Sequence, residues 1–217
     1  MRIRDAVPED AASLVEIATA VGLRDLADAG QQERGFLIDI SLEQYQYFIA
    51  NDHALVMEDD DSGRLAGFSV ILGPRTMEAT GIRGKAERIE GSSVRVGELD
   101  PDACAYWEQL AFRPRYAKGI FPVYLAFVSL RRAFLRYDHL FGAVVSRPLR
   151  NMAPLRFLEI TGWRSVGWID EDYLALGRVR YDVYYLSRSR FEEKLREPFF
   201  VRLEQRLRDH AVIGDGA

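Results

Sequence analysis

The sequence contains a single cysteine, Cys104, and only three histidines among its 217 residues. One thiol cannot form a disulfide within the chain, which is typical of proteins in a reducing compartment. His53, His139 and His210 lack the spacing of a metal site, so we predict no bound metal. These scarcities argue against a disulfide scaffold and against a zinc protein.

Long hydrophobic runs and excess positive charge are also missing. No uncharged apolar stretch reaches the roughly 18 residues of a membrane span, and the charged start, Met1 to Asp5, is unlike a secretion signal. The chain holds 29 Lys and Arg against 33 Asp and Glu, a formal net charge of −4. We therefore expect a cytoplasmic protein that binds neither nucleic acid nor a membrane.

Apolar residues make up 48% of the chain and aromatic residues 12%, which is enough for a globular core. Charge is unevenly distributed: residues 101–164 hold ten basic and four acidic residues, a balance of +6 that leaves −10 for the rest. A basic stretch within an acidic chain indicates either a site for an anionic ligand or a solvated basic helix face.

The hydrophobic periodicity predicts strands that alternate with helices in the second half, which indicates a mixed α/β sheet. The predicted strands are 2–7, 53–57, 64–72, 103–113, 139–145, 163–169 and 179–186. The predicted helices are 9–22, 43–48 after a Ser41 cap, 118–137, and 152–161 between an Asn151 cap and Gly162. A further C-terminal helix is predicted to open at the Ser189–Glu192 capping box and to be interrupted by Pro198. Residues 23–34 are predicted to form a second helix or a mobile loop.

Two segments depart from this regular pattern. Residues 73–102 contain five glycines and no aromatic residue, so we predict a lid, a loop insert or local disorder there. The C-terminal apolar stripe of Phe199, Phe200, Leu203 and Leu207 either packs on the domain or makes a homodimer contact. The predicted organisation is one domain over 1–187, with 74–102 as an insert, followed by a helical extension over 188–217.

The strand 103–113 leads into the most informative part of the chain. Strict alternation would place Tyr106, Glu108, Leu110 and Phe112 on one face and Trp107, Gln109 and Ala111 on the other. After Pro114 a short basic loop with Gly119 opens a helix, so free N–H groups and the positive helix end converge on one point. This predicts an anion site strengthened by Arg115 and Lys118, although a purely structural turn accounts for the pattern equally well.

A second block, residues 151–163, lies one strand further on, and the pair resembles the GNAT (GCN5-related) N-acetyltransferase superfamily. The first signature of that family is matched by residues 110–114, Leu-Ala-Phe-Arg-Pro, and the second by Asn151, Phe157, Gly162 and Trp163. The resemblance covers residues 1–187. It implies a mixed, mostly antiparallel twisted sheet of about six to seven strands, flanked by helices, with a splayed central pair of strands.

The resemblance also implies that acyl-CoA binds between the strands 103–113 and 139–145. The residues implied in this binding are the backbone of Leu110, Ala111 and Phe112 for pantetheine, Arg115 and the N–H groups of Ala117, Lys118, Gly119 and Ile120 for the pyrophosphate, and Asn151 for the pantetheine arm. Two positions depart from the family pattern. Phe121 replaces the second small residue of the loop, which is also one residue short, and Leu158 replaces the tyrosine that often protonates the departing thiolate.

Glu108 is the candidate general base and Tyr106 a candidate acid. Transfer to an ammonium requires deprotonation before attack, and a partly buried carboxylate with a raised pKa suits this task. The structural alternatives are a strand-end carboxylate paired with an arginine for Glu108 and a packed aromatic ring for Tyr106. Cys104 is expected to be a small buried apolar residue rather than a nucleophile.

These observations predict an enzyme that transfers acetyl from acetyl-CoA to a primary amine in a ternary complex, with the Phe112 N–H polarising the thioester oxygen. The acidic remainder of the chain favours a cationic acceptor such as an amine, polyamine or aminoglycoside, and the 74–102 insert should border the acceptor site. Two alternatives stay open: a longer-chain transferase of the N-acyl amino acid or acyl-homoserine type, and a catalytically silent acyl-CoA-binding module.

Overall fold

The computed structural model describes residues 1–23, 32–33, 35–38, 40–173 and 177–209. It contains a seven-stranded sheet in the order β1-β2-β3-β4-β5-β7-β6, in which only the β4–β5 pair is parallel. The strands are β1 (Arg2–Asp5), β2 (His53–Glu58), β3 (Leu65–Leu72), β4 (Cys104–Phe112), β5 (His139–Arg147), β6 (Arg164–Tyr173) and β7 (Gly177–Ser187). The predicted mixed and mostly antiparallel sheet is confirmed.

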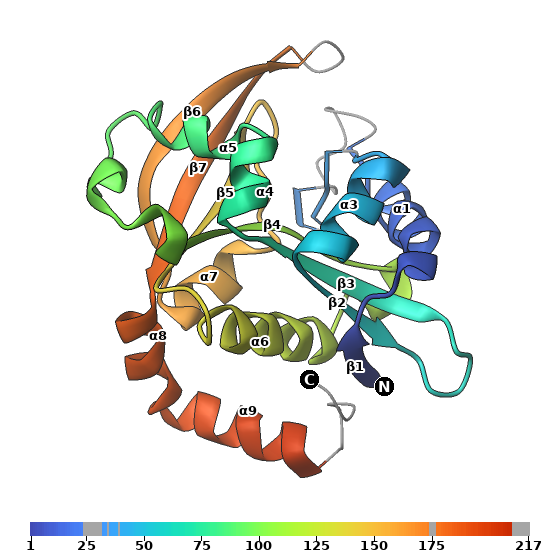
Figure 1. Ribbon diagram of the computed structural model, residues 1–217. Helices are drawn as coiled ribbons and strands as arrows, with labels where there is room; N and C mark the ends of the chain where they lie inside the picture. Colours follow the sequence, from blue (N-terminus) through green and yellow to red (C-terminus); the bar gives the residue numbers. More distant parts are fainter. Residues whose placement is uncertain (24–31, 34, 39, 174–176, 210–217) are drawn as a thin grey trace.

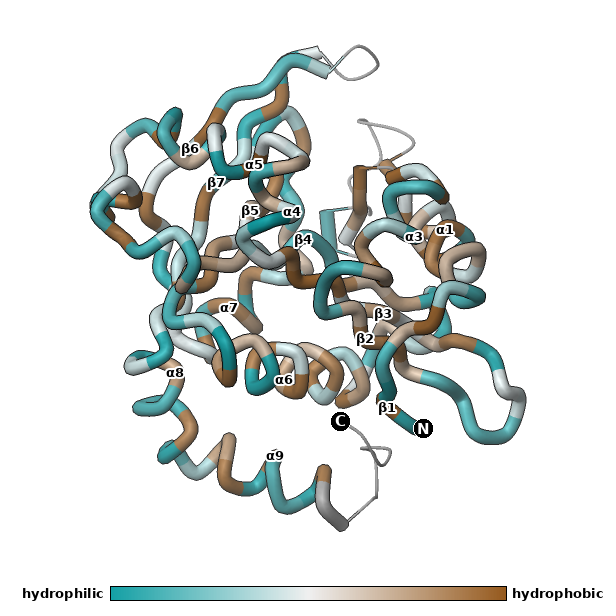
Figure 2. Tube along the Cα trace, in the orientation of Figure 1, coloured by the Kyte–Doolittle hydropathy of each residue, from teal (hydrophilic) through white to brown (hydrophobic). Residues whose placement is uncertain are grey.

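Helices cover both faces of this sheet (Figure 1). The helices are α1 (Ala11–Ala20), α3 (Leu42–Asn51), α4 (Pro74–Ala79), α5 (Ile82–Ala86), α6 (Phe121–Ala133), α7 (Leu155–Thr161), α8 (Arg188–Leu195) and α9 (Pro198–Asp209). One core lies between α1, α3 and the strands β2 and β3, and a larger one lies around α6 on the opposite face. In Figure 2 the central strands are largely hydrophobic, whereas the turn between β2 and β3 is hydrophilic.

Strand β4 contains a bulge that corrects the predicted alternation. Val70 of β3 is paired with Gln109 and Ile71 with Trp107, so Glu108 is an extra residue opposite the pair. Because a bulge shifts the alternation by one residue, Ala111 joins the core beside α1, while Phe112 joins the core around α6. The prediction that Glu108 and Phe112 share a face is therefore wrong.

Residues 73–102 were predicted to form a lid, a loop insert or a locally disordered segment, and the structure shows short helices there. They form α4, α5 and two short 3-10 turns, because Pro74 begins the first helix and Gly81 adopts a left-handed conformation that separates the two. Glu90 pairs with Trp168, and the Ser93 N–H donates to the Val166 carbonyl. The insert thus covers the outer edge of β6, which protects that edge from pairing with another chain.

Gly167 allows this close approach, and its replacement should weaken the contact between the insert and β6. Its φ is +155°, and an added Cβ would lie 2.4 Å from the Glu90 carbonyl oxygen. We expect Gly167→Ala to lower the free energy of unfolding by about 1–3 kcal/mol, measured by urea denaturation. Gly84→Ala, in α5 with open space around it, is the matched control and should be neutral or slightly stabilising. Equal stability of the two variants would contradict this account.

Three helix starts differ from the prediction. Pro154 rather than Asn151 precedes α7, because the Asn151 N–H and side chain are bonded to the Val145 and Phe36 carbonyls. Helix α8 begins two residues early, where β7 ends, and is capped by Ser187 rather than Ser189. Helix α6 begins at Phe121, after the loop. The Ser41 cap is confirmed, and most of the predicted element over 23–34 lies outside the described residues.

Candidate active site

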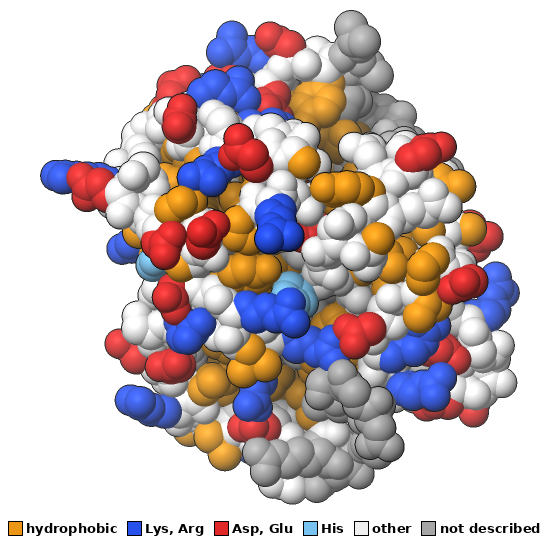
Figure 3. Space-filling view, in the orientation of Figure 1, with side chains coloured by type: hydrophobic (Ala, Val, Ile, Leu, Met, Phe, Trp, Pro, Cys, Tyr) orange, Lys and Arg blue, Asp and Glu red, His pale blue; other side chains and the backbone are white. Residues whose placement is uncertain are grey.

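A cavity of about 650 Å³ lies on the α3 side of the sheet. Its floor is formed by β4 and β5, and its walls come from α3, the 74–102 insert and the β6–β7 hairpin. The lining is more apolar than polar, and Glu108, Tyr106 and Asn151 are among its polar side chains. The structure therefore brings both predicted catalytic side chains to one concave site. Across the visible surface in Figure 3, acidic and basic side chains are interspersed.

Glu108 lines this cavity from the bulge of β4. Among the described residues, its carboxylate has no hydrogen-bond or ion-pair partner, so the alternative of a strand-end carboxylate paired with an arginine has no support here. Burial raises the pKa of Glu108 to about 7, partly opposed by Lys85 and reinforced by Glu171. A carboxylate with such a pKa is half-ionised near neutrality and can accept a proton from a bound ligand.

Tyr106 lies two residues earlier on the same face. Burial raises its pKa well above the ordinary value, and the charge of Glu108 adds to this shift. The phenol therefore stays protonated at neutral pH. Its hydroxyl is able to donate to a ligand, because it donates to none of the described residues.

The roof of the cavity was not anticipated from the sequence. Glu171 of β6 pairs with Lys85 of α5 at 2.9 Å and with Arg88 at 3.1 Å, and the Tyr173 hydroxyl donates to the Glu171 carboxylate at 3.3 Å. Tyr181 donates to the Tyr173 hydroxyl at 2.7 Å. Contacts between residues 86 positions apart leave no local signal in the sequence. The expectation that the insert borders the site did point to this part of the chain.

Strands β4 and β5 separate immediately beside Glu108. They are paired only from Cys104 with His139 to Trp107 with Gly142. The Arg113 N–H donates to the Ala66 carbonyl of β3, so by the alternation of an antiparallel ladder Ala111 also faces β3. The backbone groups of Leu110 and Phe112 then face the gap that β5 leaves. This is the predicted splay, and its free N–H and C=O groups are able to hold an extended ligand.

The loop after β4 presents a second set of free donors. In the described residues, the N–H groups of Lys118, Gly119 and Ile120 donate to no carbonyl, whereas Ala117 donates to Pro114 at 3.4 Å. Gly119 has a φ of +91° with open space around it, and the Lys118 amine is unpaired within the described chain. No side chain caps α6, so these groups and the helix end fit a diphosphate.

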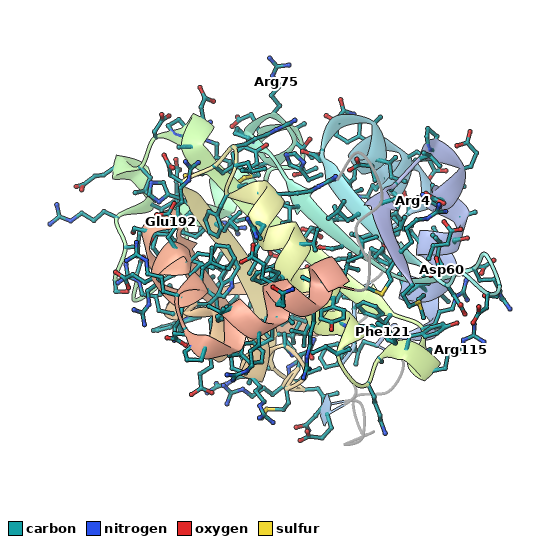
Figure 4. All side chains as sticks on the ribbon, turned by 90° about the horizontal axis from the view of Figure 1, so that it is seen from below. Arg4, Asp60, Arg75, Arg115, Phe121 and Glu192 are labelled. Atoms are coloured by element: carbon teal, nitrogen blue, oxygen red, sulfur yellow. The ribbon has the colours of Figure 1, made fainter. Side chains whose placement is uncertain are left out.

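Arg115 is directed elsewhere. Its guanidinium lies 3.4 Å from an Asp59 carboxylate oxygen and 4.3 Å from the centre of the Tyr116 ring. Tyr116 also donates to Asp59. Figure 4 shows Arg115 next to the β2–β3 turn that carries Asp60. The side chain thus fastens the loop to this turn, and the phosphate contacts implied by the resemblance would require it to leave Asp59.

Among solved structures with the same architecture are two that contain an acyl-CoA. YncA from Salmonella typhimurium, solved with its cofactor acetyl-CoA, is 15% identical, with a TM-score of 0.56 over 87% of this chain and 94% of that one. GphF, a GNAT-like decarboxylase in complex with isobutyryl-CoA, is 17% identical, with a TM-score of 0.56 over 87% and 100%. A ribosomal-protein-alanine N-acetyltransferase from Brucella melitensis is 14% identical, with a TM-score of 0.56 over 86% and 99%.

The chain has the GNAT fold. No protein-family model and no curated protein matches the sequence. At 14–17% identity the likeness establishes the fold alone, and the same fold supports different reactions. Any function must therefore be argued from this chain's own side chains.

The structure also shows the surroundings of Asn151 and Leu158, two further positions of the GNAT resemblance. The Asn151 amide donates to the Phe36 carbonyl at 3.0 Å, while its side-chain oxygen, buried at the cavity wall, has no partner among the described residues. An unpaired buried acceptor is costly unless a ligand donates to it, so this oxygen fits the amide-rich pantetheine arm. Leu158 is buried in the core around α6, and its own side chain has no hydroxyl to protonate a thiolate.

Cys104 behaves as expected for a structural thiol. It is 6% exposed, and burial raises its pKa to about 11. Its Sγ lies 3.2 Å from the Asp100 carbonyl, to which the S–H donates. A thiol in this state is not a nucleophile at neutral pH. In the described residues no group of three His, Cys, Asp or Glu side chains is arranged to hold a metal, and no helix is long and apolar enough to span a membrane.

Proposed function

We propose that the protein transfers an acetyl group from acetyl-CoA to a primary amine, with Glu108 as the general base. The observation that supports this most strongly is the unpaired Glu108 carboxylate in a cavity that opens beside the splayed end of β4. The free N–H groups of residues 118–120, the Lys118 amine and the unpartnered Asn151 oxygen support binding of the CoA portion.

In this proposal the chain positions two substrates and moves protons. Glu108 accepts a proton from the ammonium, which frees the nitrogen lone pair for attack on the thioester carbon. The C–N bond forms and the C–S bond breaks; the second proton of the nitrogen passes through the Tyr106 hydroxyl to the departing sulfur, and Glu108 returns the first proton to solvent. Tyr106, which stays protonated, is the group we assign to donate toward that sulfur. A backbone N–H at Leu110 or Phe112 is suited to polarise the carbonyl oxygen.

Binding of acetyl-CoA is the first measurement. At about 100 times its dissociation constant, acetyl-CoA should add about 2.7 kcal/mol to the stability of the folded protein and visibly raise its Tm. Lys118→Glu should weaken this binding about tenfold, because a cation would be replaced by an anion near the diphosphate. Arg190→Glu in α8 is a charge-matched control on a distant exposed surface and should leave the shift unchanged.

Other results would revise the proposal. A folded protein whose Tm responds to no CoA species would mean that residues 117–120 hold no diphosphate. Binding without release of CoA in the presence of amines would favour a silent acyl-CoA-binding module. A steadily larger Tm shift with longer acyl-CoA donors would favour the longer-chain transferase. Because GphF shows that this fold also supports decarboxylation, the acylated amine itself should be detected by mass spectrometry.

A further inference from the structure

The interior of the cavity combines apolar walls with a single unpaired charge among the described residues, Glu108. The apolar walls are formed by side chains from α3, from the 74–102 insert, from β5 and from the β6–β7 hairpin. Among them are Phe48, Met77, Ile82, Phe141, Ile169 and Val183. Phe48, Phe141, Ile169 and Val183 are all nearly or fully buried. An acetyl group with its thioester needs only part of 650 Å³, so the remaining apolar volume is available to the acceptor.

The charged groups of the lining are satisfied with one interior exception. Glu171 is paired with both Lys85 and Arg88, and Arg83 lies 3.7 Å from Glu78 at the exposed rim. Glu87 is exposed to solvent at the rim. Glu108 is thus the one interior charge of the described lining without a partner, and it can balance one cationic nitrogen.

The other free polar atoms point to the same conclusion. The Asn151 side-chain oxygen is an acceptor, and the Tyr106 hydroxyl can donate or accept. Gln109 is committed, because Tyr45 donates to its side-chain oxygen and its amide donates to the Ile38 carbonyl at 3.4 Å. The described interior therefore offers no unpaired cation to neutralise a carboxylate or phosphate on the acceptor.

We infer that the acceptor is a monoamine on an extended apolar or aromatic body that carries no carboxylate. The inference rests on the proposed function and narrows its substrate class. An amino acid would bury an unpaired carboxylate against apolar walls. A polyamine or aminoglycoside would place further ammonium groups in the interior, where Glu108 alone among the described lining residues is free to pair. The apolar body would replace water along the walls, while the amine reaches Glu108.

Paired substrates test each part of this inference. With acetyl-CoA as donor, kcat/KM should rise about three- to fourfold for each methylene from propylamine to hexylamine, from about 0.8 kcal/mol per buried methylene. Phenethylamine should exceed phenylalanine by at least about a hundredfold, because the two differ only by the carboxylate. Spermidine should be no better than propylamine.

A cavity variant ties these preferences to the proposed walls. Ala143 of β5 lines the cavity between Phe141 and Val145, so Ala143→Phe should fill part of the apolar space. We expect the ratio of kcat/KM for hexylamine over propylamine to fall at least about tenfold in this variant. Ala143→Ser adds almost no volume and should keep the ratio. The acetyl-CoA-induced Tm shift of Ala143→Phe verifies that the variant is folded and binds its donor.

The outcomes separate failure of this inference from failure of the proposed function. Acetylation of spermidine or phenylalanine in preference to the apolar amines would overturn the inference and keep the acetyltransferase. A flat alkylamine series would also overturn it. If instead the rate depended on acyl-chain length of the donor, the apolar space would belong to the acyl group. If acetyl-CoA binds but no amine is acetylated, the proposed function fails, and the inference fails with it.

Discussion

Replacing Glu108 with Gln is expected to lower kcat for amine acetylation about 100- to 1000-fold at pH 7.5, a typical contribution of a positioned general base. Gln has the same shape and leaves the backbone of β4 in place, so the acetyl-CoA-induced Tm shift should be unchanged. Glu87→Gln, at the exposed rim of the same cavity, is the matched control and should change kcat less than about twofold. Equal effects of the two substitutions would exclude Glu108 as the base.

The pH dependence provides a readout that a structural role would not produce. A base works in its ionised form, so kcat/KM of the natural enzyme should rise with pH and level off above about 7, the pKa of Glu108. The charged groups facing this carboxylate are Lys85 of α5 and Glu171 of β6, and Tyr106 and Tyr173 stay neutral. The limb near pH 7 should disappear in Glu108→Gln, because the remaining activity no longer depends on this ionisation.

The same substitution should stabilise the protein. The pKa of Glu108 is raised in the folded state to about 7 from its ordinary value of 4.5, so the folded state binds the proton more tightly. Wild-type stability attributable to this group is therefore lost as the pH rises from 4.5 through 7. Glu108→Gln avoids the loss and should have the higher Tm at pH 8, with the difference shrinking toward pH 4.5. A catalytic group held at a cost to stability is expected to behave in this way.

The sequence was most informative where the signals are local. The Ser41 cap, the turn between β2 and β3 and the interruption of the C-terminal helix at Pro198 each follow from a few adjacent residues, and the structure confirms them. Glu108 and Tyr106 lie two residues apart on one strand and line one cavity, while their catalytic roles stay predictions. Local propensities act over one or two turns of chain, and such features lie within that range.

Structural features that depend on residues far apart in the chain could not be predicted from local sequence signals. The bulge at Glu108 depends on how β3 is paired with β4, and the sequence of β4 alone predicts plain alternation. The Lys85–Glu171 pair joins an insert to a strand that follows much later in the chain. Asn151 matches the pattern of a helix cap, but its amide is bonded to the Phe36 carbonyl. In each case tertiary contacts outweigh the local preference.

The C-terminal apolar stripe is packed into the main core of the protein. Phe200, Leu203 and Leu207 are at most 3% exposed, and Phe200 stacks on Phe127 of α6 with ring centres 5.8 Å apart. Helix α9 is therefore continuous with the core around α6 rather than an appendage beyond residue 187. Figure 1 shows it lying along α6 on the side away from the sheet.

Phe200→Ala is accordingly expected to lower the free energy of unfolding by about 3–5 kcal/mol, measured by urea denaturation. Domains of this size are typically stable by only about 5–15 kcal/mol, so the variant should also lose a large part of its Tm. Phe199→Ala removes the same side chain one residue earlier, where 38% of the surface is exposed, and should cost less than about 1 kcal/mol. Equally small losses of unfolding free energy in the two variants would mean that α9 is an independent extension. The expected large difference between them would mean that the folding unit includes α9. Truncation at residue 187 would then expose the core beneath α6.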